Sequence, residues 1–204
     1  MHLDNLNSDE DMRSHATFVP TRGNVEYREG TSGQTGLPDH EADIVTCSQS
    51  LHWMDSRPTF REVARILRPG GVFAAFDYDW PPTTGVWQAD AAYVECMKTI
   101  NELEMSTSPE SRVKSFPKDQ HIDRMRESLC FEFAKEIVVH HVTKGNADTF
   151  IGLLLTQGGV QTLLKAGRSP EHLAITRFAE RAREFLGDEK RDWYWSSRVR
   201  IGIA

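Results

Sequence analysis

Residues 42–77 read ADIVTCSQSLHWMDSRPTFREVARILRPGGVFAAFD, and this stretch decides the predicted fold. Residues 42–47 contain a short β-branched run, which is typical of a buried strand. Apolar side chains recur at i, i+3, i+4 and i+7 in residues 58–67, and Pro69 with two glycines follows, so the pattern predicts a helix that ends there. Residues 72–77 form the next predicted strand. Because a strand, a helix and a strand with short links make a βαβ unit, we expect an α/β fold with a parallel sheet.

The remaining segments extend this pattern along the chain. Further strands are predicted at residues 25–28, 131–141 and 193–203, and helices at residues 88–105, 119–129, 147–166 and 170–186, the last one after a Ser169 cap. We interpret residues 1–204 as a single domain, in which the helical segments 88–129 and 147–186 are inserts.

Composition excludes several classes of protein. The 204 residues are 39% hydrophobic and 26% charged, which is typical of a globular domain, and the net charge of -6 argues against a nucleic-acid binder. The three cysteines are widely spaced, so neither a disulfide framework nor a metal site is predicted. No apolar run reaches the roughly 20 residues of a membrane helix, and the polar first residues lack the features of a secretory signal. A cytoplasmic protein is therefore expected.

Two stretches, ADIVTCSQSLHW (42–53) and ILRPGGVFAAFD (66–77), resemble the class I S-adenosylmethionine-dependent methyltransferases, in the group of methyltransferase type 11 and trans-aconitate methyltransferase. The resemblance implies a Rossmann-like sheet with strand order 3-2-1-4-5-7-6, whose strands three to seven are the five predicted here. Strand one and its glycine-rich turn have no counterpart, so it also implies an N-terminally truncated domain that lacks the first strand. We expect the first 40 or so residues to pack irregularly or to take the place of that strand.

The cofactor implied by the resemblance is S-adenosyl-L-methionine. In the family, the loop after the fourth strand lies along the cofactor and opens toward the methyl acceptor. Ser48, Gln49 and Ser50 would then line the cofactor, while His52 and Trp53 would face the methyl-transfer site. On the residues alone, packing in the core remains an alternative for both His52 and Trp53.

Three further segments carry expected site residues. The stretch DYDWPP (77–82) follows the fifth family strand, and substrate contacts are expected there, with Trp80 among them. In EGTSGQTGLP (29–38), Thr31 stands where the family has an acidic adenine contact, and Ser32 lies beside it. The segment SDEDMRSHA (8–16) resembles the family segment around an anchoring methionine, which places Asn7 at the ribose-binding position. The residues before Asn7 do not form the apolar strand that the family has there.

The predicted activity is methyl transfer to a small-molecule acceptor. The alternative is a truncated, non-catalytic or partner-completed fragment with weak or no cofactor binding. We assign no catalytic residue, because in-line methyl transfer depends on alignment more than on a dedicated acid or base. Neither a nucleic-acid nor a membrane partner is expected, whereas an exposed sheet edge with Ile44 and Val45 predicts self-association.

Overall fold

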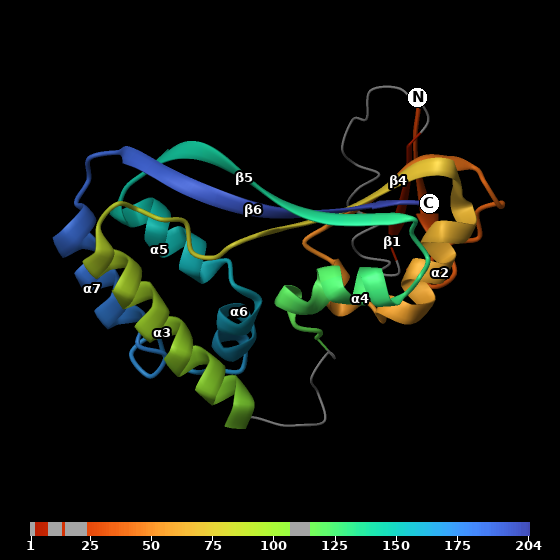
Figure 1. Cartoon of the computed structure of the whole chain (residues 1–204). Coiled ribbons are helices and arrows are strands. Elements are labelled where there is room, and N and C mark those ends of the chain that lie inside the picture. The colour runs from red at the N-terminus through yellow and green to blue at the C-terminus, as the bar shows by residue number, and fades with distance from the viewer. Residues whose placement is uncertain (1–2, 8–13, 15–23, 107–114) are drawn as a thin grey trace. The chain divides into compact units, whose positions relative to one another are not determined.

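A computed structural model describes residues 3–7, 14, 24–106 and 115–204 of the chain (Figure 1). The strands are β1 (Leu3–Asn7), β2 (Val25–Glu29), β3 (Ala42–Ser48), β4 (Leu67–Tyr78), β5 (Phe133–Gly145) and β6 (Arg191–Ile203). The α-helices are α2 (Ser56–Ile66), α3 (Trp87–Ser106), α4 (His121–Glu127), α5 (Ala147–Leu155), α6 (Gly158–Lys165) and α7 (Ile175–Leu186). Two short 3₁₀ helices are η1 (Leu51–Trp53) and η3 (Lys118–Gln120).

The chain folds into two compact units. The first comprises Met1–Asp77, Lys114–Ile137 and Arg198–Ala204, and the second comprises Tyr78–Val113 and Val138–Ser197. Strands β5 and β6 contribute residues to both. The predicted helical segment 88–129 is divided, because α3 belongs to the second unit and α4 to the first. That the units act as a single domain, with the inserts over the substrate side, stays a prediction.

The larger sheet has four strands in the order β3-β4-β6-β5. Strands β3 and β4 run parallel, with Ile44 beside Val72 and Ser48 beside Phe76, and α2 connects them. This confirms the βαβ unit and the order 4-5-7-6 that the family resemblance implied. The parallel register brings the carboxyl ends of β3 and β4 together at one edge.

The two N-terminal strands form a separate sheet. β1 and β2 pair in parallel from Leu3 beside Val25 to Asn7 beside Glu29. The residues before Asn7 therefore do form a strand, although it is polar rather than apolar, and the expectation of irregular packing is wrong for residues 3–7. Backbone pairing explains the difference, because a parallel ladder satisfies backbone groups even where side chains are polar. Within the described residues, neither β1 nor β2 pairs with β3.

Several predicted boundaries shift, and hydrogen bonds explain two of these shifts. Strand β4 begins at Leu67 rather than at residue 72, because Gly70 N donates to Ala204 O (2.8 Å) and Ala204 N donates to Gly71 O (3.0 Å), which holds this stretch extended. Helix α7 begins at Ile175 rather than at residue 170. The Ser169 hydroxyl accepts a hydrogen bond from His172 N (3.2 Å), so it caps a turn that precedes the helix.

The first unit has a core between α2 and the parallel strands. Helix α2 begins after Asp55, whose carboxylate accepts from Arg57 N, and one face of the helix buries Phe60, Val63 and Ile66. The Phe60 ring meets Phe73 of β4 edge-on at 5.9 Å between centroids. These contacts explain why the apolar spacing in the sequence predicted the helix.

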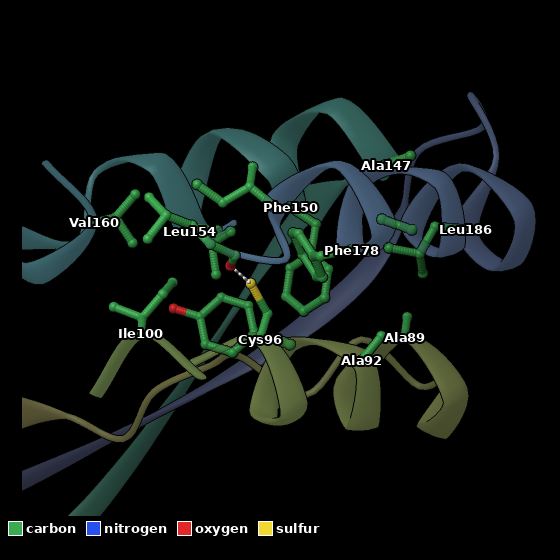
Figure 2. Packing of buried hydrophobic residues seen from close by; sticks show 14 of the residues in the cluster. Ala89, Ala92, Cys96, Ile100, Ala147, Phe150, Leu154, Val160, Phe178 and Leu186 are labelled. Carbon is green, nitrogen blue, oxygen red and sulfur yellow. Dashed lines mark hydrogen bonds between the residues drawn. The ribbon is translucent and has the colours of Figure 1, made fainter. Parts of the chain in front are cut away.

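The second unit has an all-apolar helical core (Figure 2). Figure 2 shows Phe150 of α5 and Phe178 of α7 lying close together, with Cys96 of α3 donating to Leu173 O (3.5 Å). Phe150 is fully buried, and its ring also contacts Trp193 of β6 at 5.4 Å between centroids. Helices α3, α5 and α7 therefore pack around an aromatic centre.

Neither the long α3 nor any other helix of the described ranges has the length and apolarity needed to cross a membrane.

Ile44 is 63% exposed on β3, which lies at one end of the strand order. Self-association through this edge stays a prediction.

Candidate functional site

The candidate site lies where β3 and β4 end. Gln49 directly follows β3 and adopts a left-handed backbone conformation (φ 50°), and its N–H donates to Phe76 O of β4 at 2.9 Å. The chain then enters η1, in which Trp53 N donates to Ser50 O. In open parallel sheets this carboxyl edge is where ligands bind. The turn therefore directs the residues after Ser48 to the ligand-binding edge.

The predicted residues of this loop differ in exposure. Ser48 is exposed, Gln49 and Ser50 are half-buried, and His52 is buried at 9% exposure. Trp53 is 53% exposed, and its ring lies 4.6 Å from the His52 ring between centroids. The alternative that Trp53 is a core residue is therefore wrong, because half of its surface faces solvent.

Asp77, the last β4 residue of the first unit, is the centre of a buried polar cluster. Its Oδ2 accepts from Arg200 Nη1 at 2.6 Å, while its Oδ1 lies 3.6 Å from His52 Nδ1 and 3.4 Å from Lys118 Nζ. Asp77 is 4% exposed and Arg200 is fully buried. Burying a charge is costly unless it is paired, so the Asp77–Arg200 pair is what allows both groups to lie inside.

The cluster is extended by residues from η3, α4 and β5. Arg200 Nε lies 2.8 Å from Glu136 Oε2, and Arg200 Nη2 donates to Lys118 O at 3.0 Å. Lys118 Nζ donates to Gln49 Oε1 at 3.1 Å, which joins the cluster to the predicted cofactor loop. Phe116 N donates to His52 O at 2.8 Å. The segment before α4 is thus held against the carboxyl edge.

Both histidines of the cluster are held neutral. Burial, followed by the charge of Arg200, lowers the pKa of His121 to about 4. Burial, followed by the charge of Lys118, also lowers the pKa of His52. At neutral pH each imidazole therefore has one nitrogen that donates and one that accepts.

The loop after β2 is anchored on α2. Glu62 Oε1 accepts from Thr35 N (2.8 Å), from Thr35 Oγ1 (2.6 Å) and from Arg65 Nη2 (2.7 Å), and the Arg65 contact is the main reason that the pKa of Glu62 falls to about 2. The predicted residue Ser32 is half-buried and accepts from Thr59 Oγ1 at 2.8 Å, whereas Thr31 is exposed. The anchored loop therefore leaves Thr31, rather than Ser32, open to solvent.

Asn7 is the last residue of β1 and lies in register with Glu29, the last residue of β2. The parallel pair brings an amide and a carboxylate residue to one strand end. Sequence analysis placed Thr31 at the acidic position and missed Glu29, although a carboxylate directly after a predicted strand was a usable signal. The methionine expected to anchor this segment, Met12, lies outside the described residues.

Trp80 belongs to the second unit and lies with other aromatic rings. It meets Trp195 at right angles, 5.1 Å between centroids, and is 39% exposed. It also lines an open groove of about 770 Å³ in that unit, together with Tyr93, Met97 and Met105. The groove is mainly apolar, so it suits an organic group with little charge.

The residues that sequence analysis missed are the charged partners of this cluster. The sequence could have indicated Asp77 as a site residue, since Asp77 begins the DYDWPP stretch at the end of a predicted strand. Lys118, His121 and Arg200 carried none, because Arg200 is 123 positions from Asp77 and only folding brings the two together.

Comparisons with known proteins support the family. Residues 3–75 match the family described as a methyltransferase domain. An uncharacterized methyltransferase of Bacillus subtilis, YcgJ, is 36% identical over 69 residues, which are 32% of this chain and 27% of that protein. The 27-O-demethylrifamycin SV methyltransferase of Amycolatopsis mediterranei is 35% identical over 83 residues, which are 40% of this chain and 30% of that protein. The matched part thus spans less than a third of either relative.

The fold has a solved counterpart. A structure from Anaeromyxobacter dehalogenans, described provisionally as a type II methyltransferase, superimposes with a TM-score of 0.67 at 23% identity, and the match covers 99% of this chain and 80% of that one. This similarity supports the α/β fold with its mixed sheet. Residues 3–75 therefore resemble a methyltransferase domain, while the structural similarity bears on the fold alone.

Proposed function

We propose that this protein transfers a methyl group from S-adenosyl-L-methionine to a small-molecule acceptor at the carboxyl edge of β3 and β4. The observation that carries the proposal is the turn at Gln49, which joins the exposed loop after β3 to a buried cluster of charged and imidazole groups. This combination suits a reaction between a large polar cofactor and a second, precisely held molecule.

The residues present fit the cofactor in three respects. Asn7 and Glu29 end neighbouring parallel strands, which suits hydroxyl groups of a ribose. Thr31 and Ser48 are exposed hydroxyl residues. Trp53 presents an exposed aromatic ring, and a ring face attracts a sulfonium cation.

In this proposal, Asn7, Thr31, Ser32, Ser48, Gln49 and Ser50 hold the cofactor. Ser32 contributes through its backbone, because its hydroxyl already contacts Thr59. The cofactor supplies a methyl group on a positively charged sulfur. His52 and Trp53 position the acceptor beside it and exclude water, and a contact of Trp80 with the acceptor stays a prediction.

A small-molecule acceptor is favoured over nucleic acid by the net charge of -6, because phosphate binding needs clustered basic residues. The relative from Amycolatopsis mediterranei acts on 27-O-demethylrifamycin SV by its name, which is consistent with an organic acceptor.

Calorimetric titration of S-adenosylhomocysteine into the full chain tests the cofactor part. We expect micromolar affinity for S-adenosylhomocysteine. In a parallel titration with S-adenosyl-L-methionine we expect Trp53→Ala to weaken the affinity about tenfold, since stacking of an aromatic ring on the sulfonium cation contributes about 1 to 2 kcal/mol. Trp87→Ala is the matched control, because Trp87 is 73% exposed in the second unit.

The second candidate is a non-catalytic fragment that binds cofactor weakly or not at all. It is favoured by one observation, that in the described residues the sheet of β1 and β2 is separate from β3. Absence of heat at millimolar S-adenosylhomocysteine, from a chain shown to be folded, would favour this candidate and contradict the proposed activity.

A further inference from the structure

Five buried side-chain atoms of the Asp77 cluster have no hydrogen-bond partner among the described residues. They are Gln49 Nε2, His52 Nδ1, Asp77 Oδ1, His121 Nε2 and Arg200 Nε, of which Arg200 Nε lies within ion-pair distance of Glu136. An unsatisfied buried polar atom costs about 1 to 3 kcal/mol, so the other four in one cluster are unusual in a site with a purely structural role. A polar group bound at this cluster would form hydrogen bonds with these atoms.

Asp77 has one oxygen engaged and one available. Its Oδ2 is held by Arg200, and Arg200 is in turn held by Glu136, so the carboxylate has a fixed orientation. Its Oδ1 has two cationic or imidazole neighbours, His52 Nδ1 at 3.6 Å and Lys118 Nζ at 3.4 Å, and neither forms a hydrogen bond with it. Asp77 Oδ1 is therefore a hydrogen-bond acceptor that has no donor among the described residues.

The other buried side-chain atoms of the cluster that lack a partner are mostly hydrogen-bond donors. Arg124 Nη1 lies 3.4 Å from His121 Nδ1, and because a guanidinium can only donate, His121 Nδ1 accepts. A neutral His121 then carries its proton on Nε2, the atom without a partner. Gln49 Nε2 is an amide donor as well. The site therefore offers several donors and a single anionic acceptor.

This arrangement discriminates between ligand classes. A carboxylate or phosphate would be repelled by the negative charge of Asp77, whereas an ammonium group would be repelled by the positive charges of Lys118 and Arg200. A hydroxyl group donates one hydrogen and accepts others, so it can satisfy both kinds of atom. Lys118 is the most exposed member, with 37% of its side chain open, and is the one that can move aside to admit a ligand.

We propose that Asp77, with Gln49, His52 and His121 around it, binds the hydroxyl group of an uncharged acceptor, and that this hydroxyl oxygen receives the methyl group. The inference rests on the proposed function, and it names the substrate class as alcohols or phenols. The hydroxyl donates to Asp77 Oδ1 and accepts from the neighbouring donors.

The role of Asp77 follows from the balance of the transfer. As the acceptor oxygen forms its bond to the methyl carbon, the methyl–sulfur bond breaks and its electron pair stays on sulfur. The oxygen loses its hydrogen, and the proton passes to Asp77 Oδ1 and then to solvent. Arg200 keeps Asp77 oriented and is a positioning residue.

Phenol, benzylamine and benzoate test the substrate class, since they share one ring and are neutral, cationic and anionic at pH 7. Binding is measured on the full chain from the NMR shifts of the histidine imidazoles, and anisole formation is measured by mass spectrometry after S-adenosyl-L-methionine is added. We expect phenol to bind at least tenfold more tightly than the two charged probes. We expect Asp77→Asn to weaken phenol binding about tenfold, because the amide can present a donor to the hydroxyl.

Asp43→Asn is the matched control, because Asp43 is exposed and paired with Arg68 outside the cluster. If Asp77→Asn does not fold, Gln49→Met keeps the Asp77–Arg200 pair and should weaken phenol binding about threefold to tenfold. Charged probes that bind as tightly as phenol, or folded variants that bind phenol as the wild type does, would overturn the inference. Selective phenol binding without cofactor binding would support this site and contradict the proposed methyl transfer.

Discussion

The two compact units differ in what they bury. The buried acidic, basic and imidazole side chains of the described residues all belong to the first unit: Glu62, Asp77, Arg200, His52 and His121. The second unit encloses aromatic and aliphatic side chains around Phe150 instead. Buried charges cost stability unless they are paired, and in the described residues they are restricted to the unit in which we propose the reaction. The second unit supplies packing and a mainly apolar groove.

The largest expected effect tests the apolar unit. Phe150→Ala should lower the free energy of unfolding by about 3 to 5 kcal/mol, because it removes a fully buried ring that contacts three others. Chemical denaturation measures this loss. Phe133→Ala is the control, since Phe133 is 53% exposed, and it should cost less than about 1 kcal/mol. If both variants lowered the free energy of unfolding equally, the buried ring of Phe150 would contribute no more to stability than the exposed ring of Phe133, which would contradict this prediction.

A slightly smaller effect tests the charged unit. Arg200→Met should cost about 3 kcal/mol, because it leaves the buried Asp77 and the half-buried Glu136 without their shared cation. The double variant Asp77→Asn with Arg200→Met should recover part of this loss in the same denaturation measurement. Arg68→Met, which breaks only an exposed pair with Asp43, should change stability by less than about 1 kcal/mol. A full loss in the double variant would show that packing of Arg200 matters more than its charge.

The third expected effect is a pH dependence from His121, which is absent at neutral pH and develops only as the pH is lowered. Its pKa is lowered from 6.5 to about 4 in the folded protein, so the unfolded chain binds the proton more readily. Stability is therefore complete above about pH 6.5 and falls as the pH drops toward 4, by up to about 3 kcal/mol. His52 adds to the same trend, because its pKa is also lowered.

Denaturation midpoints between pH 7 and pH 4 measure this trend. His121→Asn should flatten the decline, whereas His172→Asn, which alters an exposed histidine of the second unit, should leave it unchanged. If the stability of His121→Asn falls with pH as it does in the wild type, other groups of the first unit cause the decline.

Local patterns account for what could be predicted. The β-branched run at residues 42–47 and the apolar spacing in α2 are short-range signals, and the structure confirms the strand and the helix. The predicted burial of the strand is wrong for Ile44, which is 63% exposed because β3 lies at one end of the strand order. Strand β1 was missed because its residues are polar and its stability comes from pairing with β2. The start of α7 was misplaced because Ser169 caps a turn rather than the helix.

The sequence by itself determined the α/β fold and a resemblance to methyltransferases, and it predicted the loop from Ser48 to Trp53, because residue spacing along a strand and its following turn is local. Tertiary structure alone decided which charges meet. Arg200 pairs with Asp77 across 123 positions, and Lys118 reaches Gln49 across 69. Such pairs form only when strands from distant parts of the chain join one sheet, and no local pattern encodes that neighbourhood.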